Sequence, residues 1–445
     1  MITAEELKLT REALSFALSE GASQARVTLA KSQEDLVATL NGEVDKVTHC
    51  LDRSLSIALF VDGRYGSFST NKLGEDSLKA FISQAVSTTR MLAPDEFRCL
   101  PELERCARNA VGGNELDLLD DEYDRITPER RNEIALQASV YKKLGKGDGY
   151  EIISEEGEYS DSIYETVLLD SNGMECHHIE NSFDYGVETT IEADGDRYSG
   201  YSWDSSTRLS GINAPECGRK ALQRAISHTG SKPVRSGKYN MVVDSDVASK
   251  VVSPILRALS AYSIQQNNSF MMDSLGKQIF PEGLTIMDVP QIKGQNCSKL
   301  FDSEGVATVE GPIIEKGVVK EYFVNTYMSK KMGIAPTIEE ATRPKVMPWP
   351  QAGLDQAAVL KKCGSGILVT DFNGGNSNSA TGDFSYGVEG FYFKNGKIVK
   401  PVSEMLVTGN FLTLWQNLTV IGDDARACMS KLIPTLAFSK VDFSG

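Results

Sequence analysis

The sequence contains few histidines and fewer basic than acidic residues, and both shortages exclude classes of function. Only four of the 445 residues are histidine, and none follows His228. The C-terminal half therefore lacks the usual base for a serine or cysteine nucleophile and the usual nitrogen ligands of zinc. Lys and Arg number 46 against 61 Asp and Glu, a formal net charge of -15. Nucleic acids and anionic membranes attract clustered positive charge, so we expect neither as a direct partner.

Paired cysteines and long apolar runs are missing as well. None of the eight cysteines forms a CxxC pair, which argues against a zinc ribbon or a redox centre. No segment approaches the roughly 18 apolar residues of a membrane span. Residues 1–21 have the pattern of an amphipathic helix rather than of a signal peptide. Together with the scattered thiols, these features predict a cytoplasmic protein.

Motifs for nucleotide binding and for serine hydrolases are also absent. The glycine-rich segment 374–387 does not match GxxxxGK[ST], and it leads into strand-like rather than helical sequence. A Rossmann fingerprint fails for the same reason. None of the four histidines lies in a GxSxG elbow, so a Ser-His-Asp triad is not indicated.

The patterns that are present predict an α+β fold: an N-terminal half of helices and antiparallel sheet, followed by a predominantly β C-terminal domain. A helix capped by Thr3 and Glu6 precedes three strand-like runs (25–32, 35–49 and 54–70) and a second helix. The Gly/Ser/Pro/Lys segment 229–238 predicts the main boundary. We expect three units, at residues 1–95, 110–228 and 236–445.

Several shorter patterns make local predictions. The acidic run 115–124 predicts a solvated connector, and Thr127-Pro128 begins a helix expected to continue to about Leu144. The strand pattern places His177 and His178 on opposite faces, with Cys176 on the same face as His178.

The C-terminal half yields three further local predictions. Ser245 or Asp246 caps a helix expected to reach about Gln266, and Pro254 either kinks that helix or marks its true start. The proline-rich segment 343–350 predicts an exposed, extended loop. Asn410 caps a segment whose apolar residues repeat at helical spacing up to Ile421, which predicts a single helix.

Residues 374–424 hold the densest set of conformationally demanding residues. Six glycines lie between Gly374 and Gly396 among many strand-forming residues. Glycine adopts positive φ and lets another backbone approach closely. The glycines predict either turns and a kinked sheet corner or a place where backbone groups meet a bound chain. The residues alone leave both interpretations open.

The same stretch is similar to the C-terminal signature of the TldD/PmbA family. The similarity is carried by GGNSNSATGDFSYGVEGFYFKNGKIVKPV, TGNFLTLWQNL and VIGDD. FDSEGVATVEGPIIEKGVVKEYFVNTY, SFMMDSLGKQIFP and LFVDGRYGSFST extend it over nearly the entire chain. The family was first named as a modulator of DNA gyrase, and it supplies subunits of a zinc-dependent peptidase. The acidic charge favours an indirect link to gyrase, through turnover of a peptide.

The resemblance also implies where a metal would be held. In the TldD branch of the family, a His-Glu-x-x-x-His helix precedes the segment corresponding to Leu275-Gly276, and the matching positions here offer Val252, Ser253 and Arg257. Metal-assisted hydrolysis needs imidazole ligands and a carboxylate to deprotonate the water. The chain therefore resembles the PmbA (TldE) branch, with no cofactor of its own and zinc in a TldD-like partner. Cys428 corresponds to a zinc-ligating cysteine, and we expect a packed thiol, a remnant ligand at most.

The resemblance implies a subunit of a zinc-dependent metallopeptidase assembly that acts on unfolded peptides and itself lacks the catalytic metal. Its partner would be a TldD-like metal-bearing subunit, or a second copy in a homodimer. An unfolded peptide would pair with a strand edge. The expected substrate-binding residues are Gly374, Gly375, Asn376, Thr381, Gly382, Asp383 and Phe384.

Two alternatives remain open from the residues. One is a self-sufficient homodimeric peptidase with an atypical metal site, formed by Cys428 and carboxylates such as Asp383, Asp423 and Asp424. The other is a peptide-binding or regulatory module without catalysis. Metal content would separate the first alternative from the leading hypothesis, and peptide binding without any cleavage would favour the second.

Overall fold

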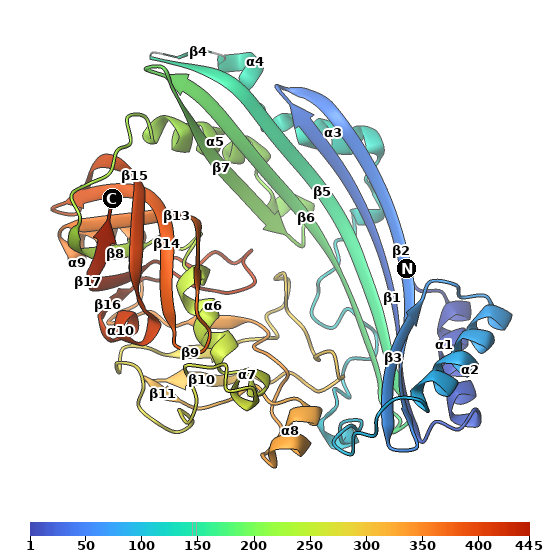
Figure 1. The fold of residues 1–445 in the computed structure, drawn as a ribbon. Helices are drawn as coiled ribbons and strands as arrows, with labels where there is room; N and C mark the ends of the chain where they lie inside the picture. The colour runs from blue at the N-terminus through green and yellow to red at the C-terminus, as the bar shows by residue number, and fades with distance from the viewer. Residues whose placement is uncertain (145, 148) are drawn as a thin grey trace.

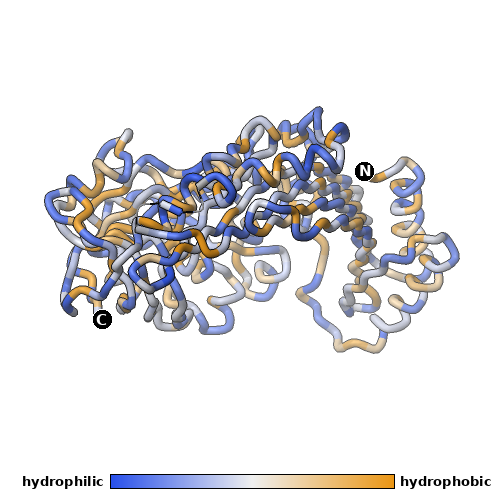
Figure 2. The backbone as a smooth tube through the Cα atoms, turned by 90° about the horizontal axis from the view of Figure 1, so that it is seen from above, coloured by the Kyte–Doolittle hydropathy of each residue, from blue (hydrophilic) through white to orange (hydrophobic). Residues whose placement is uncertain are grey.

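The structure is a computed structural model that describes residues 1–144, 146–147 and 149–445. A long curved sheet with helices forms the first half of the chain, and a β-rich body forms the second (Figure 1). The two termini lie toward opposite ends of the molecule (Figures 1 and 2). This arrangement confirms the predicted α+β fold class. Within the described residues, no helix is both long enough and apolar enough to span a membrane.

The large sheet joins the N-terminal and central parts of the chain. In the part of the chain that the structure describes it has seven antiparallel strands, in the order β3-β2-β1-β5-β6-β7 with β4 beside β5. β1 pairs with β5 from Arg26–Asp170 to Leu40–Glu156, so both segments share one sheet. The strands are β1 (Gln24–Leu40), β2 (Glu43–Val61), β3 (Arg64–Thr70), β4 (Lys146–Gly147), β5 (Tyr150–Asp170), β6 (Glu175–Ala193) and β7 (Asp196–Ser206).

Asn-Gly and Asp-Gly steps make the hairpin turns of this sheet. Both residues have positive φ at Asn41-Gly42, Asp62-Gly63 and Asp194-Gly195, as a type I′ turn requires. The Asp-Gly pairs in the sequence, each between two strand-like runs, predict hairpin turns at Asp62-Gly63 and Asp194-Gly195, and both turns are confirmed. The predicted limits of the first strands are wrong, because β1 continues unbroken to Leu40, the chain reverses at Asn41-Gly42, and β2 runs without a break from Glu43 to Val61.

Helices pack on one face of the large sheet, which we call the helix face, and the opposite face is called the open face. α1 (Ala4–Ser19) and α2 (Glu75–Thr89) cover Val27 and Leu29 at one end. α3 (Pro128–Gln137) and α5 (Ala214–Ser227) cover Tyr159 and Tyr185 at the other. The capping box of Thr3 and Glu6 is present, and Thr127 caps α3.

The helix predicted from Thr127 to Leu144 is interrupted. α3 ends at Gln137, and the short α4 (Tyr141–Leu144) follows. Between them, the buried Glu155 carboxylate accepts hydrogen bonds from the backbone N–H groups of Val140 and Tyr141, at 2.8 and 3.1 Å. This contact with β5 takes the chain out of the helical path, and it could not be seen from residues 128–144 alone.

The prediction that the acidic run 115–124 is a solvated connector is wrong for its apolar residues. Leu116 and Leu118 are buried, and the Leu118 carbonyl accepts a hydrogen bond from the Asn181 backbone N–H at 3.1 Å. The backbone N–H groups of His177 and Ile179 likewise donate to Ala110 and Gly113. Residues 110–118 therefore cover the part of the β6 edge that β7 does not reach.

The C-terminal body contains two sheets within the described residues. The larger has the order β15-β14-β13-β8-β17-β16 and the smaller β11-β10-β9-β12. Its strands are β8 (Gly237–Val243), β9 (Ile286–Asp288), β10 (Gly311–Glu315), β11 (Val318–Val319), β12 (Pro344–Val346), β13 (Gly366–Ser377), β14 (Asp383–Lys394), β15 (Lys397–Asn410), β16 (Leu418–Ile421) and β17 (Leu436–Ser444). Its helices are α6 (Ser249–Ala258), α7 (Ala261–Gln265), α8 (Thr326–Met332), α9 (Gln356–Cys363) and α10 (Phe411–Gln416).

Three predictions about this body need correction. The helix capped by Asn410 ends at Gln416, because residues 418–421 form β16, pair with β17 and exchange backbone hydrogen bonds with Trp349. The helix expected to reach about Gln266 is divided into α6 and α7, and Pro254 lies inside α6. Segment 343–350 is not an exposed loop, because Arg343, Pro344 and Val346 are buried and residues 344–346 pair with β9.

Candidate functional site

A cleft of about 1070 Å³ separates the open face of the large sheet from the C-terminal body. The sheet contributes side chains at alternating positions, which is why they share one face. The C-terminal body contributes one side of α6 and the loops around residues 297–303, 339–342 and 430–431. The sheet side is formed by Thr28, Ser56, Tyr164, Thr166, Leu168, His178 and Glu180.

The wall that α6 contributes contains two of the three residues expected at the metal-motif position. Ser253 and Arg257 line the cleft, because residues four apart lie on the same side of a helix. Val252 points away and is fully buried in the core of the C-terminal body. The Arg257 side chain is exposed, and its guanidinium makes no hydrogen bond or ion pair with the described residues. The polar groups that α6 presents to the cleft are therefore a hydroxyl and a positive charge, with Leu256 beside them.

His178 and Glu180 come from β6 on the opposite wall. His178 is only 5% exposed, and its Nε2 atom lies 3.5 Å from the nearest Glu180 carboxylate oxygen. His177 lies on the helix face, where its Nε2 atom is 2.8 Å from Glu165, which confirms the predicted opposite orientations. Cys176 is buried on the same face as His178 and contacts the Ala107 carbonyl. The alternation of side chains along the strand predicted that His177 and His178 point to opposite faces of the sheet. It did not predict that the face with His178 lines a cleft.

Among the acidic side chains that line the cleft, Asp302 has the pKa that is shifted most from its usual value. Burial, together with the neighbouring Glu304 carboxylate, raises the pKa of Asp302 to about 6. Its Oδ1 atom accepts hydrogen bonds from the backbone N–H groups of Glu304 and Val306, both at 2.9 Å. This side chain is therefore able to exchange a proton near pH 6 at the edge of the cleft.

Because of Asp302, stability is expected to fall as the pH rises from about 4 to about 7. The carboxyl has a pKa of about 6 when folded and 3.8 as a model group, so the folded state holds the proton more tightly. The contribution is complete below about pH 4 and is lost as the pH rises through 6, on the order of 2–3 kcal/mol.

The variant Asp302→Asn should remove this dependence, because the amide does not ionise. Its oxygen keeps the hydrogen bonds from Glu304 and Val306, and only the longer bond from the Glu339 backbone N–H to Oδ2, at 3.3 Å, is lost. Denaturant unfolding at pH 4 and pH 7 measures the free energy of unfolding of both proteins. Relative to the unmodified protein, the variant should be more stable at pH 7 than at pH 4. Glu310→Gln, at an exposed position, controls for the loss of one negative charge. An equal difference between Asp302→Asn and the unmodified protein at both pH values would contradict the assignment.

Cys428 lies beside a positive charge. Burial raises the pKa of its thiol, and Arg426 acts in the opposite direction. Arg343, whose side chain is fully buried, donates to the Ala427 carbonyl at 2.7 Å and to Ser298 Oγ at 3.2 Å. Burial lowers the pKa of Arg343, whereas the nearby thiols of Cys297 and Cys428 raise it.

The carboxylates considered for an atypical metal site have other partners. Asp424 accepts hydrogen bonds from both the backbone N–H and the hydroxyl of Thr435, at 2.7 Å each. Asp423 accepts from the Gly353 backbone N–H at 2.9 Å. Asp383 accepts from Thr381 and Asn410. Nowhere in the described residues do three His, Cys, Asp or Glu side chains come close enough to hold one metal ion.

The expected substrate-binding residues lie beside the cleft rather than in its lining. Gly374, Gly375 and Asn376 belong to β13 and are exposed, so the loop predicted there begins only after Ser377. The Asn410 side chain donates to the Thr381 carbonyl at 2.8 Å and to Asp383 at 2.9 Å, which ties this loop to the start of α10.

Two more of the expected residues are buried beneath that loop. Gly382 is buried against Phe270, where an added Cβ would lie 3.1 Å from the ring. Phe384 is buried and lies 4.8 Å, between ring centroids, from Phe411. Thr381 and Asp383 thus hold the loop, and Phe384 belongs to the core. Of the expected residues, only Gly374, Gly375 and Asn376, in the exposed part of β13, remain available to bind a ligand.

Much of β13 has one free edge. β8 pairs with β13 only at Ile367, Leu368 and Val369, whereas β14 pairs with β13 as far as Ser377. The edge from 371 to 377 therefore has no neighbouring strand on the β8 side among the described residues. A small cavity lined by Ser377 and Asn378 also includes Arg257, so Arg257 lies between this edge and the large cleft.

Comparison with known proteins gives matches over most of the chain. Three domain models of the PmbA/TldA metallopeptidases match in order: domain 1 at residues 25–89, the central domain at 121–229 and the C-terminal domain at 236–445. The Metalloprotease PmbA of Escherichia coli O157:H7 is 28% identical over 96% of each chain. The Metalloprotease PmbA homolog of Haemophilus influenzae is 26% identical over 100% of this chain and 98% of its own.

Solved structures share the fold over the full length. A Bacteroides thetaiotaomicron protein, described as a candidate modulator of DNA gyrase, is 39% identical with a TM-score of 0.94 over all of both chains. TldE from Thermococcus kodakarensis has a TM-score of 0.82 at 17% identity, over 98% of this chain and 100% of its own. At 17% identity, the similarity to TldE shows only that the two proteins share a fold.

Proposed function

Because this chain belongs to the PmbA/TldD family of metallopeptidases, we propose that it is the metal-free subunit of a zinc-dependent peptidase assembly that acts on unfolded peptides. The metal would be held by a TldD-like partner. The observation that supports the proposal is that Ser253 and Arg257 of α6 line the cleft, at the positions where the family resemblance would place metal ligands.

The chemistry of these side chains does not fit a zinc ion. Catalytic zinc takes neutral imidazole, thiolate or carboxylate ligands and needs a base for its water. The Ser253 hydroxyl is a poor ligand for zinc, and the Arg257 guanidinium repels a cation. Cys428 fits no better, because the Arg343 guanidinium lies near its thiol. We therefore derive no catalytic step through a metal in this chain.

The free edge of β13 supports peptide binding as the role of this subunit. An extended peptide can add to such an edge through backbone hydrogen bonds, which give affinity with little sequence preference. Exposed Gly374 and Gly375 both have positive φ. An added Cβ at Gly374 would meet nothing within 4 Å, so this residue leaves room for another backbone, whereas Gly375 is required by β14, because an added Cβ there would lie 2.0 Å from the Ser385 carbonyl oxygen. We propose that the protein is cytoplasmic and does not bind nucleic acid directly, and the net charge of -15 supports the second point.

A cleavage assay with a metal-bearing PmbA/TldD-family partner tests the proposal. The substrate is fluorescently labelled, unfolded casein, and the samples are this chain, the partner and their mixture. We expect the mixture to cleave faster than the partner and this chain to be inactive. No gain on mixing would contradict the subunit role, and stoichiometric, tightly bound zinc in the pure chain would contradict its metal-free character.

Hydrogen exchange tests the proposed peptide site separately. Addition of an unfolded peptide should slow amide exchange in residues 371–377, since those groups gain partners. Residues 241–243 of β8 already have β13 on one side and β17 on the other, and they serve as the internal control. Peptide binding without slower exchange in residues 371–377 would place the peptide elsewhere.

A further inference from the structure

The free edge of β13 ends beside Arg257. Within the described chain, residues 371–377 have no strand on the β8 side, because β8 pairs with β13 only as far as Val369. At the end of this edge, one small cavity is lined by both Arg257 and Ser377. Figure 1 shows α6, which carries Arg257, next to β13. A peptide that lies along the edge therefore brings one of its ends to the Arg257 guanidinium.

Two cations lie at this end of the edge. The exposed Arg257 guanidinium has no ion pair with the described residues. Lys250 precedes it by about two turns of α6, and its Nζ atom lies 4.7 Å from the centre of the Tyr386 ring. Tyr386 is the β14 partner of Gly375, so Lys250 lies level with that part of β13. The positive charge of α6 is thus concentrated beside residues 375–377.

Two carboxylates lie at the opposite end of the edge. Asp371 is exposed and lies directly across from Glu389 in the β13–β14 pair, where opposed side chains share a face. The Glu389 carboxylate accepts a hydrogen bond from the Asn373 side chain at 2.7 Å. Neither carboxylate forms an ion pair within the part of the chain that the structure describes. The free edge is therefore negative at residue 371 and positive at residue 377.

The carboxylate of Asp383 does not cancel the positive end. It accepts hydrogen bonds from the Thr381 hydroxyl at 2.7 Å and from the Asn410 side chain of β15 at 2.9 Å. In the sheet order, β15 lies on the other side of β14 from β13. The Asp383 charge is therefore held on the side of the sheet away from the free edge.

The direction of β8 shows how a peptide can continue the sheet. β8 runs parallel to β13 and ends at Val243, where the next residue, Asp244, donates its backbone N–H to the Val369 carbonyl at 3.0 Å. A peptide that continues in this direction has its amino end near Asp371 and its carboxyl end near Arg257. The reversed peptide would set its terminal carboxylate beside Asp371, where like charges repel. The charges along the edge therefore favour the parallel direction.

We propose that the free edge of β13 binds the carboxyl-terminal segment of an unfolded peptide, parallel to the strand, with the terminal carboxylate on Arg257. Arginine binds a carboxylate through two parallel N–H···O hydrogen bonds, and the Lys250 charge adds to the attraction. At about 3.3 Å per residue, the edge accommodates at most about seven peptide residues. The inference rests on the peptide-binding role proposed above, and it adds the chain end and the direction that this subunit recognises.

Calorimetric titration of the full chain with a peptide of defined ends tests the terminal contact. The probe is the N-acetylated peptide Ser-Thr-Val-Gln-Val-Thr-Ser, prepared with a free C-terminal carboxylate and as the C-terminal amide. The two forms differ by one negative charge. For the unmodified protein, we expect the amide to have a dissociation constant at least roughly fivefold higher, because it cannot form the charged pair with Arg257.

The variant Arg257→Gln should bind the two forms of the probe within about twofold of each other, because glutamine carries no charge. Arg235→Gln is the matched control. Arg235 is exposed and precedes β8, at the opposite end of that strand from Val243. This control also removes one positive charge, and it should keep the full preference for the carboxylate.

The variant Asp371→Asn tests the direction of the peptide. With the terminal carboxylate on Arg257, the ratio of the two dissociation constants should stay within about twofold of its value in the unmodified protein. A much stronger preference for the carboxylate in this variant would place the terminus beside Asp371 and overturn the parallel direction.

Equal binding of the two forms by the unmodified protein would overturn recognition of the terminus and leave the peptide-binding role intact. A preference for the carboxylate that persists in Arg257→Gln would overturn the assignment to Arg257. If neither form binds, the peptide-binding role itself fails, and this inference fails with it. Circular dichroism of each variant separates loss of the contact from loss of folding.

Discussion

Replacing Arg131 with methionine is expected to lower the free energy of unfolding by about 3–5 kcal/mol, because it leaves two carboxylates in the sheet without their counter-ion. The Arg131 guanidinium binds Asp161 through two hydrogen bonds of 2.7 and 2.9 Å. It also lies 3.2 Å from Asp35. Asp161 is fully buried, so water cannot replace the lost partner.

The cluster formed by Arg131, Asp161 and Asp35 also includes the hydroxyl group of Tyr159. The Tyr159 hydroxyl donates to Asp161 at 3.0 Å, and burial, with the charge of Asp161, raises the pKa of Tyr159. Burial opposes the charged form of Arg131, but the hydrogen bond and charge of Asp161 raise its pKa. The cluster joins α3 to β1 and β5, so its loss should separate the helix from the sheet.

Arg130→Met is the matched control for this prediction. Arg130 precedes Arg131 in α3, but its side chain is half exposed and its ion pair with Glu133 lies on the surface. Exposed pairs contribute at most about 1 kcal/mol, so this variant should remain close to the unmodified protein. Chemical denaturation measures both. A difference of less than about 1 kcal/mol between the two variants would show that the buried cluster does not support the fold.

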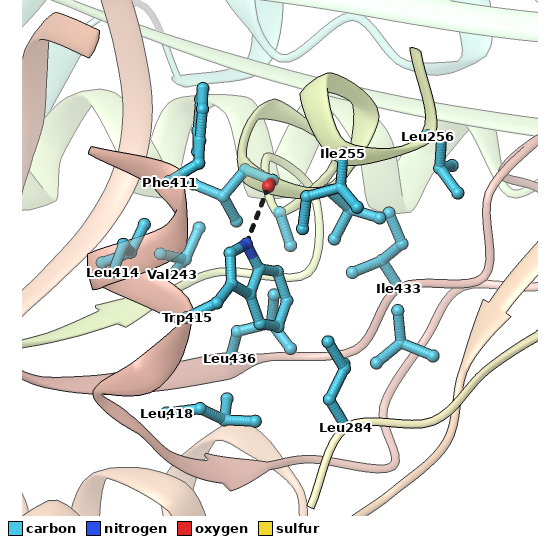
Figure 3. Close-up of a cluster of buried hydrophobic side chains, with 14 of the residues drawn as sticks. Val243, Ile255, Leu256, Leu284, Phe411, Leu414, Trp415, Leu418, Ile433 and Leu436 are labelled. Atoms are coloured by element: carbon cyan, nitrogen blue, oxygen red, sulfur yellow. Dashed lines mark hydrogen bonds between the residues drawn. The ribbon is translucent and has the colours of Figure 1, made fainter. Parts of the chain in front are cut away.

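Truncating Trp415 to alanine should cost about 3–5 kcal/mol, since it empties the centre of the C-terminal core. Trp415 is fully buried, and its Nε1 atom donates to the Val251 carbonyl of α6 at 3.2 Å (Figure 3). Its ring meets Phe438 edge to face, with centroids 5.1 Å apart. Figure 3 shows Ile255 of α6 in the same cluster.

Trp415→Phe separates the two roles of this side chain. Phenylalanine retains most of the packing but loses the hydrogen bond to α6 and part of the volume, so the expected cost is about 1–3 kcal/mol. Thermal and denaturant unfolding of both variants measure the difference. Equal costs for Trp415→Ala and Trp415→Phe would mean that the hydrogen bond, not the packing, accounts for the effect. Because Val251 directly precedes residues 252–257, either variant also tests how firmly the cleft wall is held.

Local signals in the sequence predicted the elements whose geometry depends on a few neighbouring residues. The Thr3 and Glu6 capping box and the Asp62-Gly63 turn were predicted because capping and positive φ are decided within four residues. The orientations of His177 and His178 followed from strand alternation alone. Predictions of this kind failed where a distant segment supplies the partner, as Glu155 does at the end of α3.

The candidate functional site likewise depends on contacts between distant segments, which the sequence did not predict. The sequence, through its resemblance to the family, predicted that Ser253 and Arg257 stand where metal ligands would be needed. It did not predict that they line one cleft together with His178 and Asp302, because those residues lie on separate segments of the chain.

Composition, turn chemistry and motif similarity by themselves determined the α+β class, the family and the absence of histidine from residues 252–257. Tertiary structure alone decided that β1 and β5 belong to one sheet, that residues 418–421 are a strand, and that half of β2 and part of β13 keep free edges. The physical reason is that strand pairing joins residues far apart in sequence. A free edge is therefore a property of the whole fold, and no short segment encodes it.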